Sequence, residues 1–173
     1  EKKNEEKEIL NFIRDYLTQG MNSKLYDKIR EKNHLIYNIK SGMEYCTGFS
    51  LYNIYYSVLP NLGDVEKSLK MILEILNEIS ENEFSIKTIK EIEIKRKYRK
   101  MMNNHKTNTN HCIDEAENLI HYDLNSKHFK KYYNKKIDIL KLNPKKIKEV
   151  CKKTFYKKNR CITIFSPITI SSN

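Results

Sequence analysis

The chain has 173 residues, a length typical of one domain, and 39% of them are hydrophobic, which is enough for a packed core. Its net charge is +11, and no apolar run approaches the ~20 residues that a membrane-spanning helix needs. The four cysteines lack the paired spacing of zinc fingers and of disulfide-rich domains. We therefore expect free thiols in a reducing intracellular compartment or an organelle matrix, and no membrane span.

The first part of the chain predicts two helices and a hairpin. Apolar side chains recur with helical spacing over residues 6–18. Ser23 is placed to cap a second helix over residues 24–32. Alternating apolar and β-branched residues then predict strands over residues 34–43 and 49–59. The connection between these strands is too short for a crossover, so they should pair antiparallel.

The middle of the chain predicts mainly helices. Asp64 is placed to cap a helix that ends near residue 79, and Ser85 begins another helix that ends near residue 103. Shorter helices are predicted over residues 113–122 and after Ser126.

The end of the chain predicts one more helix and a closing strand. Asn143 can cap the helix, with Pro144 in its first turn, and residues 161–165 (CITIF) read as a strand. The whole order predicts an α+β fold with two layers, in which helices pack on one face of a mostly antiparallel sheet. No linker rich in Gly, Ser or Pro divides the chain, so we expect a single domain over residues 1–173.

Most catalytic motifs are absent from the sequence. Neither H-x-x-E-H nor H-E-x-x-H occurs, and neither does G-x-S-x-G. His111 and Glu115 lie one helical turn apart, a pairing that is common on solvated helices and that predicts no metal site. Residues 127–158 are rich in lysine and could neutralise phosphates. Apolar positions keep their helical spacing between those lysines, which favours a solvated helix surface.

One segment carries a more specific combination. Arg30 and Tyr37 lie seven residues apart, across a predicted corner between a helix and a strand. The arginine offers a planar charged fork and the tyrosine a phenolic O–H. Together they suit a peptide carbonyl, or the oxyanion that develops from it during hydrolysis. On the chemistry of these two residues alone, the simpler interpretation is an exposed arginine and a half-buried tyrosine.

Residues 20–37 read GMNSKLYDKIREKNHLIY. This segment resembles the string G-M-x-S-x-L-(Y/F)-x-x-I-R-E-K-x-G-L-A-Y, which recurs in the non-metal domains of the pitrilysin/insulinase-like zinc metallopeptidases, the peptidases with an inverted H-x-x-E-H motif. Residues 49–60 with the helix that follows them, and the ending at residues 137–165, are similar to the same family more loosely. His34 and Ile36 stand where the family string has Gly and Ala.

The resemblance implies a C-terminal, non-zinc-binding domain with a LuxS/metallopeptidase-like half-domain fold. Family domains begin with a strand and this chain begins with a helix, so we expect a fragment of a larger protein that is incomplete at its N-terminus. By resemblance, Arg30 and Tyr37 hold the substrate backbone and help to stabilise the tetrahedral intermediate. Zinc, its ligands and the glutamate that activates water are implied in another domain of the parent protein, so this chain alone should be inactive.

Three functions are open at this point. The first is the substrate-binding domain of a zinc metalloendopeptidase, with a peptide substrate and the zinc-carrying domain as partners. The second is a non-catalytic family member, such as a core-like subunit of a processing or respiratory complex. The third is a basic nucleic-acid-binding module, which is the least favoured because the lysines are not interleaved with stacking aromatic residues.

Overall fold

The computed structural model describes residues 2–46, 49–58, 61–104 and 142–165. The chain divides into two compact units, residues 1–86 with 142–173 and residues 87–141. The single domain expected over residues 1–173 stays a prediction.

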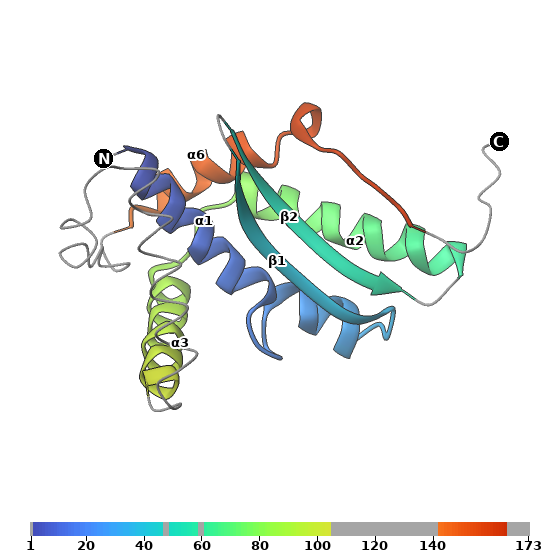
Figure 1. The fold of residues 1–173 in the computed structure, drawn as a ribbon, viewed down its shortest axis with the longest axis horizontal. Helices are drawn as coiled ribbons and strands as arrows, with labels where there is room; N and C mark the ends of the chain where they lie inside the picture. The colour runs from blue at the N-terminus through green and yellow to red at the C-terminus, as the bar shows by residue number, and fades with distance from the viewer. Residues whose placement is uncertain (1, 47–48, 59–60, 105–141, 166–173) are drawn as a thin grey trace. The chain divides into compact units, whose positions relative to one another are not determined.

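The first unit combines a hairpin with helices, which confirms the α+β fold class (Figure 1). Its elements in chain order are α1 (Lys2–Thr18), the π-helix η1 (Tyr26–Glu31), β1 (Ile36–Cys46), β2 (Phe49–Val58), α2 (Leu62–Glu81), α6 (Pro144–Thr154) and the 3-10 turn η3 (Lys157–Asn159). Helix α3 (Ile86–Asn104) lies almost entirely in the second unit.

Helix α1 supplies much of the core of the first unit. Ile9, Phe12, Ile13 and Leu17 are fully buried, and their spacing places them on one face of the helix. The rings of Phe12 and Phe84 meet edge to face with their centroids 5.2 Å apart. This face of α1 packs toward β1 and anchors the hairpin.

Strands β1 and β2 form a two-stranded antiparallel sheet. Alternate residues turn toward the helices, so that Ile39 is buried while its neighbours Asn38 and Lys40 are exposed. On β2, the Tyr52 ring meets Phe155, at the end of α6, edge to face at 5.2 Å. The hairpin is therefore covered by helices on one face.

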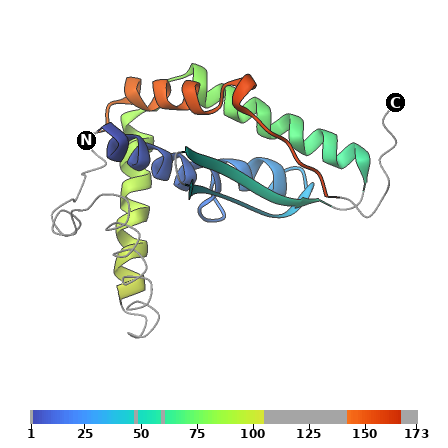
Figure 2. The same cartoon turned by 45° about the horizontal axis from the view of Figure 1, so that its top comes forward.

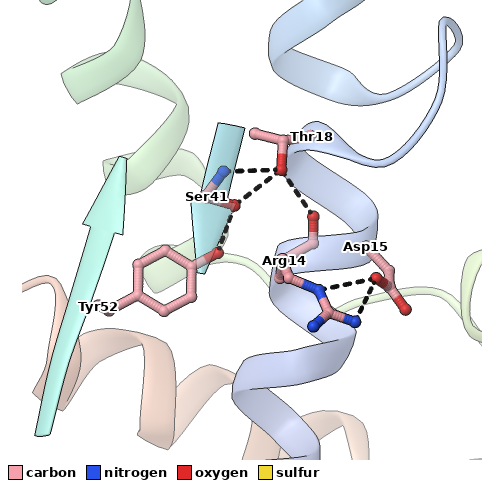
Figure 3. A network of polar contacts seen from close by, with 5 residues as sticks. All are labelled: Arg14, Asp15, Thr18, Ser41 and Tyr52. Atoms are coloured by element: carbon pink, nitrogen blue, oxygen red, sulfur yellow. Dashed lines mark hydrogen bonds and ion pairs between the residues drawn. The ribbon is translucent and has the colours of Figure 1, made fainter. Parts of the chain in front are cut away.

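A chain of polar contacts joins the end of α1 to both strands (Figure 3). The Thr18 and Ser41 hydroxyls lie 2.8 Å apart, and the Ser41 hydroxyl lies 3.1 Å from that of Tyr52. The Ser41 backbone N–H donates to Thr18 Oγ1 over 3.2 Å. Nearby, Arg14 pairs with the buried carboxylate of Asp15 at 2.9 Å. Burial raises the pKa of the Tyr52 hydroxyl, so it stays protonated and available to this network.

The two helix caps differ in how well they were predicted. Asn143 caps α6 as expected, since its side chain accepts from the Lys145 N–H over 2.9 Å. The prediction that Asp64 caps α2 was wrong. Asn61 is the cap and accepts from the Gly63 N–H over 3.0 Å. Asp64 lies in the first turn instead, where its charge favours the positive end of the helix dipole.

The closing strand predicted over residues 161–165 was also wrong. These residues are exposed and belong to no strand. A β-branched segment becomes a strand only when its backbone groups find a ladder partner, and the described sheet pairs only β1 with β2. The helices predicted over residues 113–122 and after Ser126 lie outside the described residues. Of the helices that are described, none is both long and apolar enough to span a membrane.

The first prediction concerns the core contact of α1. Phe12→Ala should lower the free energy of unfolding by about 3–5 kcal/mol, because it removes a fully buried ring and leaves a cavity beside Phe84. Phe49→Ala is the matched control, since the Phe49 side chain is 58% exposed and should cost about 1 kcal/mol or less. Urea unfolding of both variants measures this. Equal losses would contradict the assigned core.

A second prediction concerns pH. Burial raises the pKa of the Cys151 thiol from 9.0 to about 12, so the folded chain keeps this proton where the unfolded chain loses it. The resulting stability is fully present below pH 9.0 and is lost as the pH rises toward 12. From about pH 7 to about pH 10.5, wild type should lose about 2 kcal/mol more than Cys151→Ala. Parallel pH profiles of the two proteins would contradict this.

Candidate functional site

The candidate site is the corner that joins η1 to β1. The chain leaves α1 through Gly20, whose φ of 90° is a backbone conformation that glycine adopts without strain. Ser23 then donates its N–H to the Gly20 carbonyl, and its own carbonyl accepts from the Asp27 N–H over 2.9 Å. The predicted cap by the Ser23 side chain was wrong, because its buried hydroxyl has no partner among the described residues and the backbone makes the contact instead.

The predicted helix over residues 24–32 is, for most of its length, a π-helix, Tyr26–Glu31. The Lys32 N–H donates to the Asp27 carbonyl, five residues earlier, over 3.0 Å. The side-chain amide of Asn33 donates a further hydrogen bond to the Lys28 carbonyl over 2.7 Å. Short π-helical turns are rare and are found frequently at functional sites, since the wider turn re-aims side chains.

His34 ends this turn in a left-handed conformation, with φ of 53°. The His34 N–H donates to the Arg30 carbonyl over 2.9 Å, and the Leu35 N–H donates to the Ile29 carbonyl over 3.1 Å. This is a wider version of the Schellman ending that glycine usually completes. Histidine is among the residues that tolerate this region, so the corner keeps a backbone suited to glycine although a side chain occupies it.

Tyr37 is the extra residue of a β-bulge. Ile36 pairs with Val58 and Asn38 with Ser57, so two steps on β1 oppose one step on β2. A bulge turns the side chain of its extra residue away from the regular alternation. Here the bulge leaves two successive residues exposed, Tyr37 (77%) and Asn38, before buried Ile39 resumes the alternation.

The corner brings Arg30 and Tyr37 together. The guanidinium carbon of Arg30 lies 5.7 Å from the centroid of the Tyr37 ring and 4.7 Å from that of Tyr26. Both distances are within the range of cation–π attraction. Two aromatic rings, one from η1 and one from β1, thus hold the guanidinium at the surface.

The donors of this pair are available for a ligand. Within the described part of the chain, neither the guanidinium of Arg30 nor the hydroxyl of Tyr37 has a hydrogen-bond or ion-pair partner. A guanidinium fork and a phenol that are held side by side can both donate to one oxygen or to neighbouring oxygens.

Two ion pairs hold the segment around η1 on α2. Lys24 Nζ lies 2.9 Å from Glu78 Oε1, and Lys28 Nζ lies 3.6 Å from Glu74 Oε2. Burial works against the charged form of Lys24, but its hydrogen bond to Glu78 and the neighbouring Tyr16 hydroxyl outweigh that and raise its pKa. These contacts join the segment that carries Arg30 to α2.

The described part of the chain does not fit a zinc ion. It contains no cluster of three or more His, Cys, Asp or Glu side chains that could hold a metal. Of the five histidines, His34 alone falls within the described ranges, and the pair His111 and Glu115 lies outside them.

One site residue was missed by sequence reasoning. Tyr26 stood in the family string without a role, yet its ring makes the closer contact with Arg30. The signal was present, because residues four apart on a helix are neighbours and an aromatic ring there can hold a cation.

A third prediction tests the left-handed residue. His34→Val should lower the free energy of unfolding by about 1–2 kcal/mol, because a β-branched side chain clashes with the backbone at positive φ. His34→Gly should be neutral or stabilising. Asn38→Val, at an exposed strand position nearby, is the control and should cost little. Thermal and urea unfolding measure all three, and an innocuous His34→Val would contradict the conformation.

Comparison with known proteins adds the family. No curated protein matches. The crystal structure of a peptidase M16 inactive domain from Pseudomonas fluorescens shares the fold with a TM-score of 0.60 and 16% sequence identity. That match covers 84% of this chain and 33% of the other, so this chain spans about a third of that protein's length. The family profile described as the peptidase M16 inactive domain matches residues 2–93, more than half of the 173 residues. The expected family is thereby confirmed, and the chain belongs to the peptidase M16 family as an inactive C-terminal domain.

Proposed function

We propose that this chain is the substrate-binding domain of a zinc-dependent metalloendopeptidase, whose zinc and general base lie in another domain. The observation that carries the proposal is the pair Arg30 and Tyr37, held within cation–π distance at an exposed corner with their donors available. The match to the peptidase M16 inactive domain supports a role beside a separate catalytic domain.

In this proposal the pair recognises the carbonyl oxygens of a peptide. Arg30 donates charge-assisted hydrogen bonds and Tyr37 donates a phenolic one. Both bonds strengthen when negative charge develops on the oxygen, so they favour the transition state of hydrolysis over the bound substrate. The cation–π contacts fix the donors beforehand, and little reorganisation is then needed during the reaction.

The exposure of the pair fits a site that two domains complete. Tyr37 is 77% exposed, so both its ring and its hydroxyl are accessible to a partner or a peptide. The proposed partners are the zinc-carrying domain of the same protein and the peptide held between the two. Zinc bound in that other domain would supply the Lewis acid, whereas the residues of this chain would bind and orient the substrate.

The fourth prediction follows from these roles. In the intact protein that carries this chain, Arg30→Ala and Tyr37→Phe should each lower kcat by about 100- to 1,000-fold, the usual cost of losing one donor to an oxyanion. KM should change much less, because the contacts strengthen mainly in the transition state. Steady-state hydrolysis of a quenched fluorescent peptide gives both constants.

Tyr55→Phe is the matched control, since Tyr55 is an exposed tyrosine of β2 whose hydroxyl donates to Glu44 over 2.6 Å. It should leave kcat unchanged. Turnover at the wild-type level in both site variants would refute the assigned roles. The zinc content of the intact protein separates the alternatives. A protein without zinc that still binds peptides through Arg30 would be a non-catalytic member of the family.

A further inference from the structure

A groove of about 430 Å³ lies between the C-terminal part of α2 and the segment formed by α6 and η3. Figure 2 shows α6 and α2 side by side, in orange and green, with the red chain leaving the end of α6. Six of its lining residues carry the inference: Asn77, Lys148, Lys152, Tyr156, Lys157 and Arg160.

The charge of this groove is strongly positive. Lys148, Lys152, Lys157 and Arg160 line it, against the single carboxylate of Glu81. No carboxylate within the described ranges pairs with any of the three lysines. Cations gathered in one concave surface raise the local potential and attract a negatively charged partner.

Helix α6, which carries Lys148 and Lys152, also forms ion pairs with acidic side chains through two other lysines. Lys146 pairs with Glu5, and Lys153 pairs with Glu6 at 3.1 Å. These contacts join α6 to the acidic first turns of α1. Among the described residues, these ion pairs use Lys146 and Lys153 and not the lysines that line the groove.

One cation of the groove, Arg160, is held in place by hydrogen bonds within the fold. The Arg160 guanidinium donates to the Phe155 carbonyl over 2.8 Å and to Asn77 Oδ1 over 2.9 Å. This arginine therefore bridges the end of α6 to α2. Because its guanidinium is already held in place, Arg160 loses little conformational entropy when a ligand binds.

The shape and composition of the groove favour a peptide with several carboxylates over a compact phosphate. The cations are spread along two elements, with Lys148 and Lys152 one helical turn apart, so they match charges that are spaced along a chain. The carboxylate of Glu81 and the carbonyl end of α6 would repel a dense cluster of negative charge. Tyr156 is 52% exposed and offers an apolar wall to a polypeptide.

We propose that this groove binds an acidic segment of a partner polypeptide. The proposal does not rest on the peptidase function, because it uses none of the residues of the Arg30 corner. Helix α2 serves both places through different side chains. Glu74 and Glu78 hold the η1 segment, whereas Asn77 and Glu81 line the groove.

The test is binding of a fluorescein-labelled oligoglutamate peptide to the intact protein, followed by fluorescence anisotropy at low salt. The double variant Lys152→Glu with Lys157→Glu should weaken binding by about tenfold or more, because two attractive contacts become repulsive. Both side chains are exposed and make no contact that holds the fold. Lys67→Glu with Lys70→Glu, on the exposed surface of α2 outside the groove, is the control of equal charge and should retain binding.

Three further probes test which chemical class of ligand the groove prefers. An uncharged Gly-Ser peptide should not bind, and tripolyphosphate or oligothymidylate should compete less well than unlabelled oligoglutamate. Equal losses in the two double variants would overturn the proposal, since binding would then follow net charge alone. Tighter binding of either phosphate probe, lost only in the groove variant, would overturn the peptide assignment in favour of a phosphate-bearing ligand.

Discussion

The corner of this fold is constrained by apolar anchors on both of its sides. Ile29 is fully buried at the end of η1, and Leu35 and Ile36 are buried where β1 begins. The chain must reverse between these anchors within a few residues, which leaves the intervening side chains at the surface. Arg30 directly follows buried Ile29, and Tyr37 directly follows buried Ile36. The burial of these two neighbours therefore determines the positions of Arg30 and Tyr37.

The larger helices and strands could be predicted from the sequence because the apolar residues of each recur with one clear spacing. The helical spacing over residues 6–18 and the β-branched run over 49–59 both became the expected elements. The details that failed depend on tertiary context. Asn61 and Asp64 are both good caps, and only the backbone path decides between them. The segment over residues 161–165 has strand propensity, but propensity supplies no pairing partner.

The sequence predicted which two residues form the candidate site, Arg30 and Tyr37, but not the backbone geometry that holds them. The family string gave Arg30 and Tyr37, but nothing in spacing or propensity predicts a π-turn or a bulge. Both depend on how hydrogen bonds are shared between neighbouring residues once the anchors are buried. The sequence also could not show how the many lysines are used. In the structure some of them form ion pairs with Glu5, Glu74 and Glu78, and others line a groove.

Three departures from regular backbone fall within one short stretch. They are the π-turn at Tyr26–Glu31, the left-handed residue His34 and the bulge at Tyr37. Each is less stable than regular structure, and a fold that needed only to turn could use an ordinary helix end. Within this stretch lie Arg30 and Tyr37, with the guanidinium carbon of Arg30 5.7 Å from the centroid of the Tyr37 ring. Irregular backbone that concentrates on a single pair of donors supports the ligand-binding role proposed for Arg30 and Tyr37, since strained and irregular turns cluster at binding sites.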